Sequence, residues 1–416
     1  MPSDEGVPAR RTALQFLDSV LRGGMTLDAA AAKVNHLAPV DRALAVAIAG
    51  EVLRRLPDLD ALIDSATRQR LPDDSKARMV LRVALAQKIG LGTPEHALVA
   101  TALPLVDGGP RRLVHGVLGT LLRRGVPSGE APRLPDDVEQ RWREAWGDAV
   151  VAAARRQIAS RPALDLTFAD EGEAETYAAE HDGISLAPRH VRLNSSSVAD
   201  LAGFRGGRWW VQDLSASLPA RLIPAEATAV LDLCAAPGGK TMQLAAAGHQ
   251  VTALDSSESR LGRLRENLDR TKLKAELVVA DALQWQPKRR YDAVLLDAPC
   301  SATGTFRRHP EVLYRARPRI IVEGAELQSA LLDRAAEWLE ADGTLVYSVC
   351  SLEREEGEQV VEAFLSRHPE WAVSAPEDLP SFIAVHEQGW VRILPGLLED
   401  QGGLDGFFMA RLVRRT

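Results

Sequence analysis

The stretch AVLDLCAAPGGKT, residues 229–241, decides the fold class of the larger part of this 416-residue chain. A short apolar run, Ala229–Leu233, leads into a turn of small residues and then into a segment with helical spacing. Gly238 and Gly239 expose backbone N–H groups at the start of that helix, which suits a phosphate or a carboxylate group. The turn matches neither GxGxxG nor GxxxxGK[ST], so it disfavours dinucleotides and nucleoside triphosphates. A tight strand-to-helix connection without a ligand is the alternative interpretation.

The same alternation of short apolar runs and helical stretches continues downstream. We predict strands at Gln250–Leu254, Ala275–Val279, Tyr291–Leu296 and Thr344–Val349, and a long helix at Arg319–Leu339. Alternation of this kind is typical of a parallel sheet with helices on both faces, whose ligands bind at the carboxyl ends of the strands.

The N-terminal part has a different pattern. Apolar residues recur at helical spacing from Ala9 to Arg124, which predicts five to seven helices. A stretch rich in Pro and Gly follows, and a mixed region comes after it. That region opens with a predicted helix at Val138–Ser160 and continues with apolar runs at Leu164–Phe168 and His190–Leu193. We therefore predict a helical domain over 1–126, a linker over 127–136, a small α/β subdomain over 137–220 and a catalytic domain over 221–416.

Composition excludes several classes of protein. Hydrophobic residues make up 46% and charged residues 26%, which is typical of a folded globular chain. No stretch reaches the roughly 20 apolar residues of a membrane span, and the first residues lack the apolar core of a signal peptide, so we expect a cytoplasmic protein. Three cysteines, separated by 66 and 50 residues, fit neither a disulfide framework nor a zinc motif. The net charge of −7 is uneven, because residues 1–125 carry 17 basic against 13 acidic side chains.

An acidic residue follows each of three successive predicted strands: Asp255, Asp281 and Asp297. Asp255 lies 21 residues beyond Cys234, where an acid takes the hydroxyls of a bound ribose in nucleotide-binding sheets. Together the three acids outline an adenosine pocket, although each could instead cap a helix.

Two thiols leave adjacent predicted strand ends. Cys300 lies in DAPCSATGT, residues 297–305, and Cys350 lies in YSVCS, residues 347–351. A lone cysteine is most often a small buried hydrophobic residue. A pair of thiols beside a nucleotide-like cofactor instead indicates covalent catalysis, because thiolates are nucleophiles.

A basic run, Arg307, Arg308 and His309, follows the Cys300 loop. We predict that it binds phosphates of a nucleic acid. Solvated surface side chains without a ligand are the alternative.

These motifs resemble the RNA cytosine-C5 methyltransferases of the Sun/RsmB type, and the resemblance extends over residues 140–416. It rests on CAAPGGK at 234–240, DAPCSATGTFRRHPE at 297–311, YSVCSLEREEGEQVV at 347–361 and GGLDGFFMARLVRR at 402–415. The first 125 residues are more weakly similar to the helical RNA-binding domain of NusB-type antitermination factors, on Asp41-Arg42 and residues 113–118. The combination is similar to bacterial ribosomal RNA small-subunit methyltransferases. The chain departs from the family pattern at Val349, where Thr is usual, and at His115, where Asn is common.

The resemblance implies an all-α N-terminal domain followed by a Rossmann-like class I methyltransferase domain with a mostly parallel seven-stranded sheet. A small mixed α/β subdomain is expected between them. It also implies S-adenosylmethionine as cofactor, held by the turn and the strand-end acids: Cys234, Ala235, Ala236, Pro237, Gly238, Gly239, Lys240, Asp255, Arg260, Asp281 and Asp297.

In the family's chemistry, a thiolate adds to C6 of cytosine so that C5 can attack the sulfonium methyl. The resemblance assigns that thiolate to Cys350 and the release of the product to Cys300. Asp297 is expected to bond the N3/N4 edge of the base, and Lys240 to reach the active centre from the cofactor turn.

We expect the partner to be 16S ribosomal RNA before its assembly, bound by a monomer that needs neither a metal nor a membrane. The same chemistry on tRNA is the nearest alternative. A non-catalytic, antitermination-like RNA-binding factor and a nicotinamide dehydrogenase are further alternatives, and the missing glycine fingerprint counts against the latter.

Overall fold

The computed structural model describes residues 6–127, 131–194, 198 and 201–415. The chain forms two compact units. The helical unit comprises the chain up to Arg161 together with Phe306–Arg315, and the sheet unit comprises Pro162–Thr305 and Ala316–Thr416. The chain therefore leaves the sheet unit directly after Thr305 and returns to it at Ala316.

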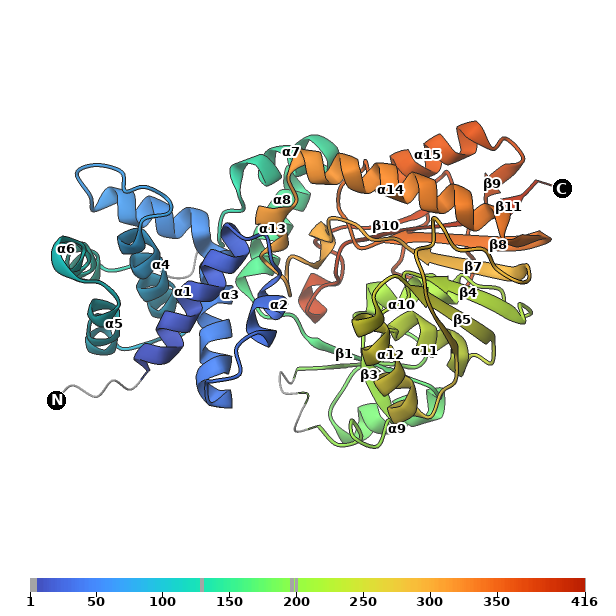
Figure 1. The fold of residues 1–416 in the computed structure, drawn as a ribbon, viewed down its shortest axis with the longest axis horizontal. Coiled ribbons are helices and arrows are strands. Elements are labelled where there is room, and N and C mark those ends of the chain that lie inside the picture. The colour runs from blue at the N-terminus through green and yellow to red at the C-terminus, as the bar shows by residue number, and fades with distance from the viewer. Residues whose placement is uncertain (1–5, 128–130, 195–197, 199–200, 416) are drawn as a thin grey trace. The chain divides into compact units, whose positions relative to one another are not determined.

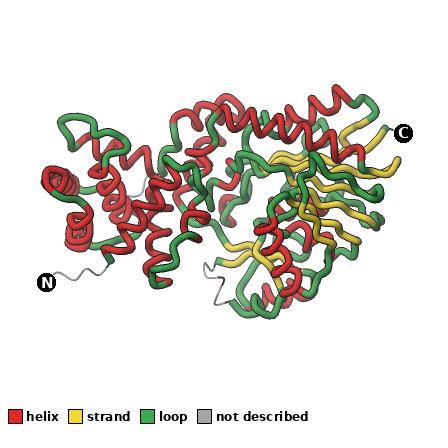
Figure 2. The backbone as a smooth tube through the Cα atoms, in the orientation of Figure 1, coloured by secondary structure: helices red, strands yellow, loops and turns green. Residues whose placement is uncertain are grey.

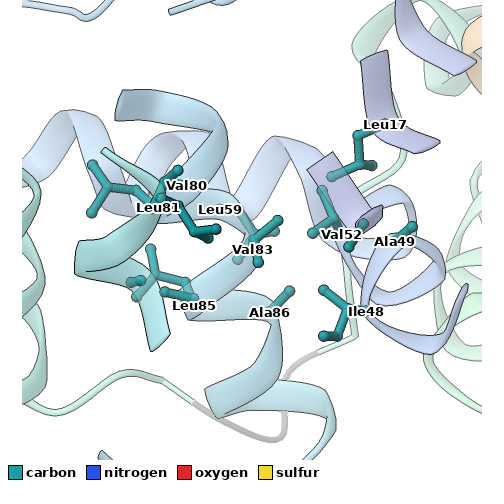
Figure 3. Close-up of a cluster of buried hydrophobic side chains, with 14 of the residues drawn as sticks. Leu17, Ile48, Ala49, Val52, Leu59, Val80, Leu81, Val83, Leu85 and Ala86 are labelled. Atoms are coloured by element: carbon teal, nitrogen blue, oxygen red, sulfur yellow. The ribbon is translucent and has the colours of Figure 1, made fainter. Parts of the chain in front are cut away.

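The helical unit has helices and no strand among its described residues (Figure 2). Its helices are α1 (Val7–Leu21), α2 (Leu27–Ala32), α3 (Pro39–Ser65), α4 (Lys76–Gly90), α5 (Glu95–Ala102), the 3₁₀ turn η1 (Leu103–Leu105), α6 (Gly108–Arg124), α7 (Asp136–Trp146), α8 (Asp148–Ala159) and α13 (Val312–Arg315). Side chains of α1, α3 and α4 interlock in its core, including Leu17, Val52 and Val83 (Figure 3). Six α-helices are described before residue 125, which confirms the prediction that this region is helical.

The boundary between the units differs from the predicted one. Helices α7 and α8 belong to the helical unit, not to a separate subdomain starting at residue 137. Part of the predicted linker packs against this unit, since Arg133 forms an ion pair of 2.9 Å with Asp58 and Leu134 is fully buried. Residues 128–130 of the linker lie outside the described residues. The predicted helix Val138–Ser160 is two helices, because Gly147 adopts a φ of +84° between them.

Helix α3 contains a proline, and a distant residue compensates for it. Pro57 has no N–H, so the Leu53 carbonyl four residues earlier lacks its usual helical donor. The Tyr314 hydroxyl donates a hydrogen bond of 2.8 Å to that carbonyl. The 306–315 segment thus satisfies a backbone group that α3 cannot satisfy itself.

The sheet unit begins with a small three-stranded antiparallel sheet in the order β2-β1-β3. Its strands are β1 (Leu164–Phe168), β2 (His190–Leu193) and β3 (Trp209–Val211), and helix α9 (Glu171–Glu180) packs against it. This is the predicted small α/β subdomain, without its first helix.

The large sheet follows the path β10-β11-β8-β7-β4-β5-β6, with β9 paired to β11. Strands β4 to β8 pair in parallel, and β9, β10 and β11 pair antiparallel at one side. The strands are β4 (Ala229–Leu233), β5 (Gln250–Asp255), β6 (Glu276–Val279), β7 (Tyr291–Asp297), β8 (Leu339–Val349), β9 (Trp371–Val373), β10 (Val391–Ile393) and β11 (Phe407–Arg414). This mostly parallel sheet confirms the predicted fold class.

Helices cover both faces of the large sheet (Figure 1). Helices α14 (Pro318–Glu337) and α15 (Glu358–Arg367) lie on one face, and α10 (Leu214–Arg221), α11 (Gly239–Ala246) and α12 (Glu258–Thr271) lie on the other. The central parallel strands β4, β5 and β7 are mostly buried, which explains their continuous apolar runs, whereas β6 at the end of the sheet is partly exposed. In the part of the chain that the structure describes, no helix is both long and apolar enough for a membrane span.

Tyr314→Phe tests the repair of α3. The variant leaves the Leu53 carbonyl without its donor, which costs about 1–3 kcal/mol for a buried polar group. Hydrogen exchange of the α3 amides measures the loss. Adding Pro57→Ala restores a backbone donor, so we expect it to recover protection in the Tyr314→Phe background and to gain less in the wild type. If Pro57→Ala increased the protection of the α3 amides equally in both backgrounds, Tyr314 would not compensate for the missing donor.

Candidate active site

The turn after β4 is shaped to approach a ligand with its backbone. Cys234 and Gly238 have φ angles of +59° and +108°, and a Cβ at Gly238 would overlap the side chain of Leu264. Ala236 donates its N–H to Asp255 Oδ2 at 3.2 Å. Helix α11 then starts at Gly239, so its free N–H groups lie beside this turn.

The acids predicted at strand ends differ in burial and in hydrogen-bond partners. Asp255 ends β5, is buried, and also accepts a hydrogen bond of 2.9 Å from the Ser257 N–H. Arg260 lies 3.5 Å from Asp255 and donates to the Ala236 carbonyl, so both residues hold the turn. Asp281 follows β6, is exposed, and accepts a hydrogen bond of 3.0 Å from the Leu283 N–H.

Cys234 is a packing residue of the turn. Burial raises the pKa of its thiol to about 12, and the nearby carboxylates of Asp255, Asp297 and Asp232 add to the shift. A raised pKa disfavours the thiolate, so this thiol is poorly suited to act as a nucleophile.

Asp232, in the middle of β4, was not among the predicted site residues. It is fully buried, its Oδ2 accepts a hydrogen bond of 2.6 Å from the Thr241 hydroxyl, and its Oδ1 has no hydrogen-bond partner among the described residues. Burial raises the pKa of this carboxyl to about 7. An acid inside an otherwise apolar strand is the sequence signal that could have identified it, because such a group is costly unless it has a purpose.

The two remaining cysteines come together. The Sγ atoms of Cys300 and Cys350 lie 3.6 Å apart, at the ends of the adjacent parallel strands β7 and β8. The Gly304 N–H donates to the Cys350 carbonyl at 3.0 Å, which joins the two loops. A hydrogen bond to Cys350 and burial raise the pKa of the Cys300 thiol well above its ordinary value. All three cysteines are free, and no cluster of metal-ligating side chains occurs within the described ranges.

An ion pair forms at the end of β7, three residues before Cys300. The Lys240 ammonium donates to Asp297 Oδ2 at 2.7 Å, and the Ser348 hydroxyl donates to Asp297 Oδ1 at 2.8 Å. The Lys240 ammonium also lies 5.2 Å from the centre of the Phe407 ring. The cofactor turn and the end of β7 are thus linked directly, and the structure gathers the four predicted catalytic residues at one edge of the sheet.

Arg307, the first residue of the basic run, is buried. This side chain is only 2% exposed, within the segment that belongs to the helical unit. The guanidinium of Arg307 is therefore not on the surface of the structure, and the phosphate contact of the basic run stays a prediction. Arg308 and His309 are half-buried, and the His309 ring lies 3.7 Å from Glu311. Glu311 in turn accepts a hydrogen bond of 3.0 Å from the Leu27 N–H at the start of α2.

Asp232→Asn tests the raised pKa. Since the folded pKa of about 7 exceeds that of the unfolded chain, the folded state holds an extra proton between the two values. The contribution of Asp232 to stability is full below about pH 4 and is lost as the pH rises through 7. We therefore expect wild type to lose stability relative to Asp232→Asn between about pH 4 and pH 7, by at most about 1.4 kcal/mol per pH unit, and no further above pH 7. Denaturant unfolding at each pH measures this difference, with Asp281→Asn as the exposed control. Parallel plots of stability against pH for wild type and Asp232→Asn would refute the raised pKa of Asp232.

The chain matches two family models. The model described as 16S rRNA methyltransferase RsmB/F matches residues 219–413, and the NusB family model matches residues 7–123. The solved structure of PH0851 has the same fold, with a TM-score of 0.74 and 21% identity over 97% of this chain and 99% of that chain.

Two full-length relatives carry one name. The ribosomal RNA small subunit methyltransferase B of Xylella fastidiosa (strain Temecula1) is 37% identical and covers 99% of both chains. The protein of that name from Klebsiella pneumoniae (strain 342) is 34% identical and covers 98% of both. This chain therefore belongs to the RsmB family of 16S rRNA methyltransferases, as a transferase with an N-terminal NusB domain.

Proposed function

We propose that this protein transfers a methyl group from S-adenosylmethionine to C5 of a cytidine in 16S ribosomal RNA, through a covalent bond to Cys350. The 3.6 Å separation of the Cys300 and Cys350 sulfur atoms supports this function most directly, and the Lys240–Asp297 pair lies at the end of the strand that leads to Cys300. Membership of the RsmB family supports the reaction class and the RNA substrate.

The residues of the cofactor turn fit S-adenosylmethionine. The N-terminus of α11 suits the carboxylate of the amino acid part, and Asp255 suits the ribose hydroxyls. The unpartnered Oδ1 of Asp232 is a buried acceptor that suits an ammonium group. When bound, the cofactor supplies a methyl group on a positively charged sulfur.

The two thiols suit two separate steps on the base: addition to C6 before methyl transfer, and removal of the C5 proton after it. Cytosine C5 is a weak nucleophile until the Cys350 sulfur adds to C6, which places electron density on C5. Asp297 bonds the N3/N4 edge and so stabilises the adduct. Because C5 and C6 are neighbouring ring atoms, two sulfur atoms 3.6 Å apart can approach one ring atom each.

Cys300 acts after methyl transfer. Its pKa is raised chiefly by the hydrogen bond to Cys350, so it holds its proton while Cys350 is a free thiol or thiolate. Once the Cys350 sulfur is bonded to C6, that hydrogen bond and that charge are gone, so Cys300 ionises more readily and releases its proton to the solvent. Its thiolate then accepts the C5 proton, the C5–H electron pair restores the C5–C6 double bond, and Cys350 leaves as a thiolate.

The substrate must expose its base. A paired cytosine leaves its stack at a cost of a few kcal/mol before it can reach the two thiols. That cost is smallest in loops and in RNA that has not yet assembled, which favours 16S RNA before assembly. A NusB domain at the N-terminus supports an RNA substrate.

Cys300→Ala and Cys350→Ala separate the two roles. Cys300→Ala is expected to accumulate a slower-migrating, RNase-sensitive species on a denaturing gel, because the adduct forms and is not resolved. Cys350→Ala is expected to form no such species and to lose methyl transfer. An adduct in Cys350→Ala alone would exchange the roles, and retained methyl transfer in Cys350→Ala would refute the nucleophile.

Mapping of methylated cytidines tests the substrate. Bisulfite sequencing of total RNA from a strain without this protein should lose one 5-methylcytidine in 16S RNA, and the gene should restore it. The Cys350→Ala gene should not restore it. Loss of a tRNA modification in place of the 16S one would assign the same chemistry to tRNA.

A further inference from the structure

Glu356 is a buried carboxylate that no step of the reaction uses. It lies six residues after Cys350 in the loop between β8 and α15, and its side chain is fully buried. Its neighbour Glu355 is exposed. A buried carboxylate is costly unless hydrogen bonds compensate it, so its partners indicate its purpose.

Those partners come from both thiol loops. The residue after Cys300, Ser301, donates its N–H to Glu356 Oε1 at 2.8 Å and its hydroxyl to Oε2. The residue after Cys350, Ser351, donates its hydroxyl to the same Oε2 at 2.5 Å. The two hydroxyls also lie 3.1 Å from each other. One carboxylate therefore joins the residues that directly follow the two thiols.

A second layer fixes the carboxylate itself. The Gln328 side-chain amide donates to Glu356 Oε1 at 3.1 Å and to the Pro299 carbonyl, on the other side of Cys300, at 2.9 Å. The Tyr347 hydroxyl donates to the Glu356 backbone carbonyl at 2.5 Å. The residues on both sides of Cys300 are thus hydrogen-bonded. Gln328 and Tyr347, which complete the network, lie in the regular elements α14 and β8.

We propose that Glu356 is a positioning residue that holds the Cys300 and Cys350 loops at the separation the reaction requires. This inference rests on the proposed function of the thiol pair. A carboxylate suits the role because it only accepts hydrogen bonds and has lone pairs for all four donors. Burial raises the pKa of Glu356, and the hydrogen bonds from Ser301 and Ser351 oppose that shift, so they favour the ionised form that accepts them.

Three variants separate positioning from general stability. Glu356→Ala removes the acceptor, Glu356→Gln keeps the size and one oxygen, and Glu355→Gln changes the exposed neighbour as a matched control. If Glu356→Ala does not fold, the double variant Ser301→Ala and Ser351→Ala removes the two hydroxyl donors and tests the same link. Circular dichroism and thermal unfolding establish that each variant is folded.

The first readout needs no RNA and no methyl transfer. Phenylarsine oxide bridges two close thiols with loss of one water, and mass spectrometry of the Cys300 and Cys350 peptides identifies the bridge. In folded Glu356→Ala we expect bridging to slow by about tenfold, with Glu356→Gln intermediate and Glu355→Gln equal to wild type. Wild-type bridging in folded Glu356→Ala, or in the folded double serine variant, would overturn the proposal.

The second readout is methyl transfer to 16S RNA. Misplacement of reacting groups by about 1 Å can cost about 10²-fold in rate, so kcat should fall by 10- to about 100-fold in Glu356→Ala while KM for RNA stays within about twofold. Glu356→Gln should recover part of kcat. A rise in KM with unchanged kcat would overturn the positioning role. Should wild type lack methyl transfer, the proposed function fails, and the arsenical readout still decides whether Glu356 holds the thiol pair.

Discussion

The parallel pairing of β7 with β8 determines where the chemistry of this protein can occur. Its register sets Asp297 opposite Ser348, and their side chains share a hydrogen bond of 2.8 Å. A shift of one residue would turn the side chains of either strand to the opposite face and separate that pair. Since the chain reaches Cys300 and Cys350 within three residues of these positions, the register also brings the two sulfur atoms to 3.6 Å.

Close packing of backbone keeps the loops beyond the strand ends in place. Gly304 lies against Gly406 so tightly that a Cβ on Gly304 would overlap the Gly406 carbonyl, and the Gly406 N–H donates to the Gly304 carbonyl at 2.9 Å. The Arg392 guanidinium donates to the Ser351 carbonyl and is itself paired with Glu358 at 2.6 Å. The loop that carries Cys350 is therefore held through its backbone as well as through Glu356. Directly after Thr305 the chain enters the helical unit, where Tyr314 completes the hydrogen bonding of α3.

Much of the sheet could be predicted from the sequence because its central strands β4, β5 and β7 are mostly buried and appear as apolar runs. The thiols could be paired because they follow neighbouring strands. The remainder depends on tertiary packing. Arg307 belongs to a basic run that is typical of a solvated surface, and only the packing of 306–315 in the helical unit shows that it is buried. Glu356 is one of four glutamates within residues 353–358, and no local pattern distinguishes it from exposed Glu355. Helices α7 and α8 belong to the helical unit through contacts that the local sequence pattern does not show.

The proposed reaction requires Cys350 to form a covalent bond with the base. RNA that contains 5-fluorocytidine tests it on the unmodified enzyme, because a fluorine at C5 cannot be removed as a proton and the adduct cannot be resolved. With S-adenosylmethionine present, we expect a stable protein–RNA complex whose cross-linked peptide, identified by mass spectrometry, contains Cys350. A complex linked through Cys300, or methyl transfer without any covalent complex, would contradict it.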